Sequence, residues 1–107
     1  MVSEYKVIFE PESEYSIQEQ ADYIAHRSGL PIIGQRYMDG ITKLCKSLAA
    51  FPYIGLKRDD LREGLRVINY KGTAIIPYLV NEETKAVHIL TVIHSSQDYE
   101  RVLRQSG

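Results

Sequence analysis

Hydrophobic residues in the first half of the chain follow one strand-like pattern and then two helix-like patterns. Residues 5–9 form a nearly continuous run of apolar and aromatic side chains, which is typical of a strand buried on both faces. Apolar side chains then recur at every third or fourth position, as on the buried side of a helix, at Ile17, Ala21, Ile24 and Ala25 and again at Ile33, Tyr37, Ile41, Leu44, Cys45 and Leu48.

Two prolines and a glycine mark the limits of the predicted helices. Pro11 and Pro31 suit the first turn of a helix, where the missing N–H group costs nothing, and Gly29 suits the position after a helix end. The helices therefore span about 11–28 and 31–50. Because only a few residues join them, we expect an antiparallel helical hairpin.

The second half of the chain predicts three strands and a short helix. Leu65 and Val67 alternate with a polar residue, as on a half-buried strand. Residues 74–80 are nearly all apolar, as in a central strand, and residues 87–93 predict a last strand with apolar side chains on both faces. The remaining segments are a loop at 52–60, turns at 71–72 and 81–85, and a short C-terminal helix at 97–104.

Pro77 stands in the middle of the predicted central strand. Proline has no N–H group to donate to a sheet, so it is normally confined to edges and bulges. We therefore expect a bulge or an unpaired sheet edge at Pro77. An open edge there, together with an apolar groove beside the helical hairpin, would accept a strand or an amphipathic helix of a partner.

These elements predict a single α+β domain over residues 1–107. The order β-α-α-β-β-β places the helical hairpin on one face of a twisted, mainly antiparallel sheet. A chain of 107 residues with 44% hydrophobic side chains has enough apolar surface for one core and too little for two.

Composition narrows the class of protein. The one cysteine, Cys45, allows no internal disulfide and lies on the apolar side of the second helix, which is typical of a buried thiol in a reducing cytoplasm. The sequence has no membrane-spanning run and no signal-peptide pattern, so we expect a cytoplasmic protein. The net charge of −1 gives little support for binding nucleic acid. Residues 1–30 hold six acidic side chains against two basic ones, so the mildly basic remainder suits an acidic protein segment.

No motif in the sequence indicates a metal or a cofactor. Three histidines and one cysteine lack ligand spacing, and there is no glycine-rich phosphate loop. His94, at the end of the last predicted strand, is either a general acid or base or a local cap that bonds a neighbouring loop. The other candidates are Tyr99, Arg62, Arg66 and Lys71, for which packing, solvation or local pairing are the alternative roles.

Several segments, taken in order and with their spacing, resemble the RelE/ParE family of bacterial toxins. They are Tyr5–Phe9 with Pro11, Ala21–Ala25, Ser47–Gly55, Asp59–Val67, and Val92–His94 followed by Asp98. The segment at 59–67 is typical of the ParE branch. Gln97 stands where the ParE ending usually has an arginine.

The ParE resemblance implies the toxin of a type II toxin–antitoxin system, one that inhibits DNA gyrase by binding and so blocks replication. It implies no catalytic residue, no cofactor and no sequence-specific contact with nucleic acid. It also implies a cognate antitoxin that folds onto the toxin, in a hetero-oligomer of two or four chains. For contact with gyrase we expect Arg62, Arg66, His94 and Tyr99.

RelE-like members of the family are ribosome-dependent mRNA endonucleases, and this activity is the alternative. It would use His94 and Tyr99 for proton transfer and Arg66 to stabilise charge. RelE-like nucleases place an arginine or lysine three residues before the tyrosine of the central strand. Counted back from Tyr78, that position holds Ile75, which can neither stabilise a phosphorane nor transfer a proton.

A third reading is a degenerate toxin that still binds its antitoxin but is no longer toxic. The departures from the family pattern at Pro77 and Gln97 motivate it. If this reading holds, replacing Gln97 with arginine restores toxicity.

Overall fold

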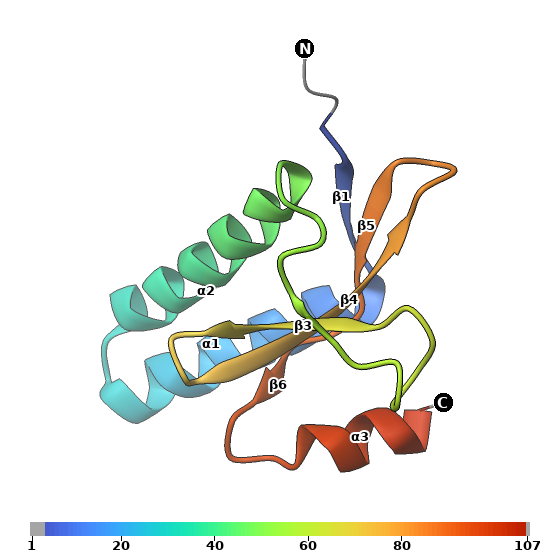
Figure 1. The fold of residues 1–107 in the computed structure, drawn as a ribbon. Coiled ribbons are helices and arrows are strands. Elements are labelled where there is room, and N and C mark those ends of the chain that lie inside the picture. Colours follow the sequence, from blue (N-terminus) through green and yellow to red (C-terminus); the bar gives the residue numbers. More distant parts are fainter. Residues whose placement is uncertain (1–3, 107) are drawn as a thin grey trace.

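The computed structural model describes residues 4–106 and has the predicted α+β fold, with two long helices packed on a mixed sheet (Figure 1). The elements in chain order are β1 (Lys6–Phe9), α1 (Pro11–Ser28), α2 (Pro31–Lys46), the 3-10 helix η1 (Ser47–Ala49), β2 (Leu56–Lys57), β3 (Arg66–Tyr70), β4 (Ala74–Asn81), β5 (Ala86–Ile89), β6 (Ile93–His94) and α3 (Tyr99–Ser106). The short strand β2 lies in a segment that was predicted to be a loop. Within the described range, no helix is long and apolar enough to cross a membrane.

The helix α1 has the predicted boundaries, and α2 begins where predicted but ends at Lys46, with the 3-10 helix η1 continuing to Ala49. Pro11 and Pro31 occupy the first turns of α1 and α2. Gly29 follows α1 in a left-handed conformation with φ of 73° and donates its N–H to the Ala25 carbonyl at 3.0 Å. The two helices approach closely because Gly34 has no side chain, and a Cβ atom there would lie 2.4 Å from the carbonyl oxygen of Ala21.

The sheet has the strand order β1-β5-β4-β3-β2, and β6 pairs with β4 beyond the end of β5. All paired strands are antiparallel except β1 and β5, which are parallel. The first strand of the chain is therefore an edge strand. Lys6 is exposed and residues 7–9 are half-buried, so the prediction of burial on both faces is wrong.

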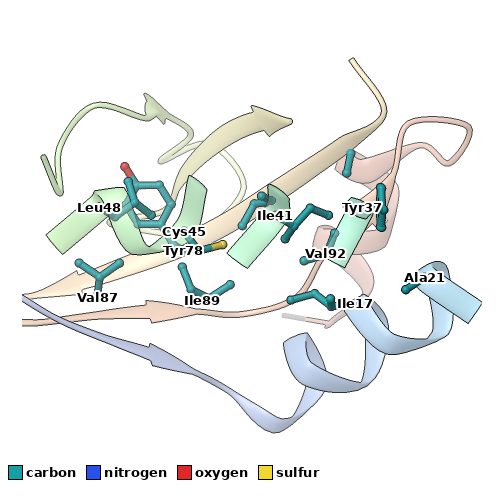
Figure 2. Packing of buried hydrophobic residues seen from close by; sticks show 12 residues of the cluster. Ile17, Ala21, Tyr37, Ile41, Cys45, Leu48, Tyr78, Val87, Ile89 and Val92 are labelled. Atoms are coloured by element: carbon teal, nitrogen blue, oxygen red, sulfur yellow. The ribbon is translucent and has the colours of Figure 1, made fainter. Parts of the chain in front are cut away.

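One face of the sheet packs against the helical hairpin to form the main core (Figure 2). Its buried members are Ile17, Ala21, Tyr37, Ile41, Cys45, Leu48, Ala74, Ile76, Tyr78, Val87, Ile89 and Val92. Because side chains alternate along a strand, the buried residues Leu65, Val67, Pro77 and Ile93 lie on the opposite face. The helix α3 lies on that side, away from the hairpin (Figure 1).

Pro77 is buried in the central strand and pairs with Val67 of β3, so the prediction of an open sheet edge there is wrong. The predicted bulge is confirmed, but it lies in the partner strand. Ile76 and Pro77 face three residues, 90–92, between the ends of β5 and β6. The Leu90 N–H bonds to the Pro77 carbonyl at 3.0 Å. This bulge divides the last predicted strand, 87–93, into β5 and β6.

The predicted hairpin turn between β3 and β4 is confirmed. Lys71 and Gly72 both have positive φ, 50° and 75°, and the Thr73 N–H closes the turn on the Tyr70 carbonyl at 2.9 Å. Positive φ at both central positions is what tight hairpin turns require.

Candidate functional site

Side chains that could bind a metal do not cluster in the part of the chain that the structure describes. Within residues 4–106, no group of three or more His, Cys, Asp or Glu could hold a metal ion. Cys45 is buried as predicted, and burial raises the pKa of its thiol to about 12, so it is a poor nucleophile. The candidate site consists of the four predicted contact residues, Arg62, Arg66, His94 and Tyr99, and the groups that hold them.

Arg66 is bonded to the protein's own backbone. Its guanidinium donates to the carbonyl oxygens of Tyr53 at 3.0 Å and Gly55 at 2.9 Å, and lies 5.0 Å from the centroid of the Tyr53 ring. The Gly55 N–H in turn donates to the hydroxyl of the buried Tyr78 at 2.9 Å. Arg66 therefore fixes the loop between η1 and β2.

This fixed loop presents large apolar side chains to solvent. Phe51, Ile54 and Leu56 are 65%, 70% and 65% exposed. The Tyr53 hydroxyl donates to the carboxylate of Glu82, which ties the loop to the β4–β5 turn. Exposed apolar side chains on a well-anchored backbone are typical of an interface. Sequence analysis missed this surface, although the apolar residues inside the predicted loop were a usable signal.

Tyr99 is tied to Arg58, which sequence analysis did not single out. Arg58 donates to the Tyr99 hydroxyl, and its guanidinium lies 5.5 Å from the centroid of the Tyr99 ring. Arg58 also bonds both carboxylate oxygens of Asp60, at 2.9 and 2.8 Å, and the Glu100 carboxylate at 2.6 Å. Only 14% of the Arg58 side chain is exposed. The hydrogen bonds from Arg58 hold the pKa of the Asp60 carboxyl below its ordinary value.

Arg62 lies in the loop between β2 and β3, close in the chain to Arg58. The Arg62 N–H donates to the Arg58 carbonyl at 3.3 Å, and its carbonyl accepts from the Leu65 N–H at 3.0 Å. Its side chain is exposed and has no ion-pair partner in the part of the chain that the structure describes. Unlike Arg66, whose guanidinium bonds loop carbonyls, Arg62 therefore has a guanidinium that is free to contact a partner.

His94 lines a separate groove of about 390 Å³ between α1 and the segment after β6, together with Glu19, Tyr23 and Gln97. Its Nδ1 accepts the N–H of Ser96 at 3.0 Å and lies 2.8 Å from the Ser96 hydroxyl. The neutral ring therefore carries its proton on Nε2. This is the local capping role that was one of the two readings of His94.

The four candidates therefore divide among three places. Tyr99 bonds to the Arg58 side chain, and Arg62 lies in the same loop as Arg58, with its N–H on the Arg58 carbonyl. Arg66 anchors the apolar loop, and His94 lies in the groove beside α1. Ile75 is half-buried in β4 and pairs with Asn69 and Ile93, so this position supplies no cation.

The comparisons with known proteins identify the family. Residues 7–99 match the family described as the ParE toxin of the type II toxin–antitoxin system parDE. No curated protein matches the chain at a significant level. A solved structure described as the chromosomal ParDE toxin–antitoxin system from P. aeruginosa has a TM-score of 0.73 at 16% identity, over 87% of this chain and 98% of that one.

A second solved structure, the toxin–antitoxin complex RelBE2 from Mycobacterium tuberculosis, has a TM-score of 0.61 at 22% identity, over 85% of this chain and 98% of that one. At these identities the two structures support the fold. The match over residues 7–99 gives the family. The chain therefore belongs to the ParE toxin family of type II toxin–antitoxin systems.

Proposed function

We propose that this toxin inhibits DNA gyrase by binding it, without catalysing a reaction, and that a cognate antitoxin neutralises it in the bacterial cytoplasm. One observation carries the non-catalytic reading: each group that a ribonuclease would need already has a structural partner. Arg66 bonds loop carbonyls, Tyr99 accepts from Arg58, and His94 accepts from the Ser96 backbone.

Metal-free RNA cleavage needs a base, an acid and a cation that all reach one phosphate. Here the three groups bond to different segments, Arg66 to the loop after η1, Tyr99 to Arg58 and His94 to Ser96. The neutral His94 ring offers a donor at Nε2 instead of a free base. Ile75 leaves the central strand without a cation at the position where RelE-like nucleases have one. These features favour binding over cleavage.

Two surfaces are candidates for contact with gyrase. The first contains the free guanidinium of Arg62 and the side chain of Tyr99, whose hydroxyl bonds to Arg58 in the loop after β2. The second is the apolar loop that Arg66 anchors, so that Arg66 acts through the loop. The two similar structures carry ParDE and RelBE2 toxin–antitoxin names, which supports an antitoxin as the second partner.

Parallel binding measurements separate the candidate functions. The purified, folded protein is immobilised and titrated with gyrase and with 70S ribosomes, and mRNA is checked for cleavage on translating ribosomes. We expect saturable binding to gyrase, no binding to ribosomes and intact mRNA. Ribosome binding with mRNA cleavage would replace this proposal with the RelE-type activity. Binding to neither, with retained antitoxin binding, would support the degenerate reading.

A further inference from the structure

We propose that the outer edge of β1 binds the same edge of a second copy of this chain, so that the sheets of the two copies join across a two-fold axis. The strand β1 lies at the end of the sheet opposite to β2 (Figure 1). Within residues 4–106, β5 is the one strand that pairs with β1. An edge strand of this kind offers backbone groups that another strand can pair with.

The pairing of β1 with β5 determines which backbone groups point outward. The N–H groups of Lys6 and Glu10 donate to carbonyls on the β5 side, at 2.8 and 3.0 Å. Because alternate residues of a strand direct their backbone groups the same way, those of Val7 and Phe9 point away from β5. The Tyr5 N–H, next in this outward series, donates to a carbonyl of η1 at 2.9 Å. In the described part of the chain, Val7 and Phe9 are therefore the residues of β1 left for a partner strand.

One symmetric register uses the outward groups of both residues. In an antiparallel pair, two residues that lie opposite each other with their backbone groups facing exchange both of their hydrogen bonds. When Val7 of one copy lies opposite Phe9 of the other, Phe9 of the first also lies opposite Val7 of the second. Ile8 then lies opposite Ile8 of the second copy, on the two-fold axis.

Charge favours this register on the face of β1 that points away from the helices. Val7 and Phe9 pack against the main core. Because side chains alternate along a strand, Lys6 and Glu10 lie on the opposite face. The register places Lys6 of each copy opposite Glu10 of the other. Lys6 is exposed and forms no ion pair within the described residues, and Glu10 bonds His88 through Oε2 alone, at 2.8 Å.

The helix side of the same edge repeats this order of charges. Lys46 is the last residue of α2, next to η1, which accepts the Tyr5 N–H. Glu14 lies in the first turn of α1 and donates its N–H to the Glu10 carbonyl at 3.2 Å. Both side chains are exposed, and neither forms an ion pair in residues 4–106. The two-fold axis brings the Lys46 end of one copy toward the Glu14 end of the other, so opposite charges meet a second time.

Apolar surface lies between these two charged ends. A groove of about 400 Å³ beside the edge is lined by Phe9, Ile17 and Met38, with Glu14 and Lys46 among its other lining residues. Val7 of the second copy, opposite Phe9, would lie next to this groove. Because β1 has only four residues, the interface is small, and we expect a weak dimer that forms at high protein concentration.

Reversing the charge at either end of β1 tests the register. In a homodimer, Lys6→Glu and Glu10→Lys each place like charges opposite each other, so each variant should dimerise about tenfold more weakly than the wild type. An equimolar mixture of the two variants places opposite charges at both ends and should recover the dimer. Analytical ultracentrifugation over a range of concentrations measures the dimer, and circular dichroism confirms that each variant is folded.

Lys57→Glu is the matched control. Lys57 is exposed on β2, at the other end of the sheet, so its reversal should leave dimerisation unchanged. If Lys57→Glu weakened the dimer as much as Lys6→Glu does, the effect would follow from net charge and would contradict this interface.

Amide hydrogen exchange of the wild-type protein locates the interface independently. The N–H groups of Val7 and Phe9 should exchange several-fold more slowly at a concentration that forms the dimer than after dilution, because they become bonded. The Ile8 N–H points toward β5 and should change little. A wild type that stays monomeric, a dimer in which Val7 and Phe9 remain unprotected, or folded charge variants that do not dimerise when mixed would overturn the proposal.

Discussion

At the scale of single residues, Arg66 holds a surface loop in place instead of offering its own charge to a partner. Its charge-assisted hydrogen bonds end on two carbonyls of the loop between η1 and β2, and its guanidinium packs on the Tyr53 ring. The loop contains no helix or strand, so its backbone is held in place mainly by these bonds and by the bond of Gly55 to the Tyr78 hydroxyl. The exposed apolar side chains of the loop are therefore held at fixed positions.

Replacing Arg66 with alanine should lower the free energy of unfolding by about 1–3 kcal/mol, because two carbonyls lose a charged donor. Arg62→Ala is the matched control and should change it by less than about 0.5 kcal/mol, since the Arg62 side chain is exposed and unpaired in the described residues. Urea unfolding measures both. Equal stabilities of the two variants would contradict a structural role for Arg66.

The two glycines of α2 should respond differently to alanine. At Gly34 the new Cβ meets the Ala21 carbonyl oxygen at 2.4 Å, so the helices must separate. We expect a loss of about 1–3 kcal/mol from overpacking, despite the better helix propensity of alanine. At Gly40 the Cβ meets the tip of the Tyr70 side chain, which can move, so the loss should be smaller. Thermal unfolding measures both, and the opposite order would contradict this packing.

At the scale of elements, one arginine links the start of α3 to the loop after β2. Arg58 lies in the loop after β2 and bonds Tyr99 and Glu100 at the start of α3. Nearer the other end of the helix, Arg104 approaches Asp60 at 3.9 Å. Under α3, the sheet face with Val67 and Pro77 is buried.

Removing the Arg58 side chain should loosen α3 while the helical hairpin stays intact. We expect Arg58→Ala to raise amide hydrogen exchange over residues 99–106 several-fold, because the helix loses its charged anchor. Lys57→Ala is the control, since Lys57 is exposed and its pair with Asp59 is long at 3.6 Å. Unchanged exchange in Arg58→Ala would show that apolar contacts alone hold α3.

The contribution of the Arg58–Asp60 ion pair to stability has a predictable dependence on pH. Arg58 lowers the pKa of Asp60 in the folded protein, so the pair stabilises the fold fully above the ordinary Asp pKa of 3.8. That stabilisation is lost as the pH falls below 3.8 and through the lowered folded-state value. Exchange over 99–106 should therefore rise in this acidic range for the wild type and much less for Asp60→Asn. Identical pH profiles would contradict the assignment.

At the scale of the whole molecule, the sequence predicted the individual helices and strands better than it predicted which strands pair with each other. The helices and the β3–β4 hairpin depend on local periodicity and on turn residues such as Gly29 and Gly72, so they could be read directly. The parallel pairing of β1 with β5 and the bulge opposite Pro77 depend on residues far apart in the chain. No periodic signal encodes such pairings.

The candidate site was harder to predict for the same reason. Arg66 and His94 have a definite chemistry in sequence, but their roles depend on partners in irregular segments. Arg58 was not singled out from the sequence, and its bond to Asp60 joins two residues close together in the chain. Its contact with Tyr99 joins segments about 40 residues apart and needs the fold to be seen.

A supercoiling assay with purified gyrase tests the central claim most directly. Relaxed plasmid and ATP are incubated with gyrase and increasing amounts of the folded protein, and the products are scored for supercoiled and linear DNA. We predict dose-dependent loss of supercoiling with accumulation of cleaved DNA, and weaker inhibition by the stable variant Arg62→Ala. Full supercoiling at a large molar excess of the folded wild-type protein would contradict gyrase as the target.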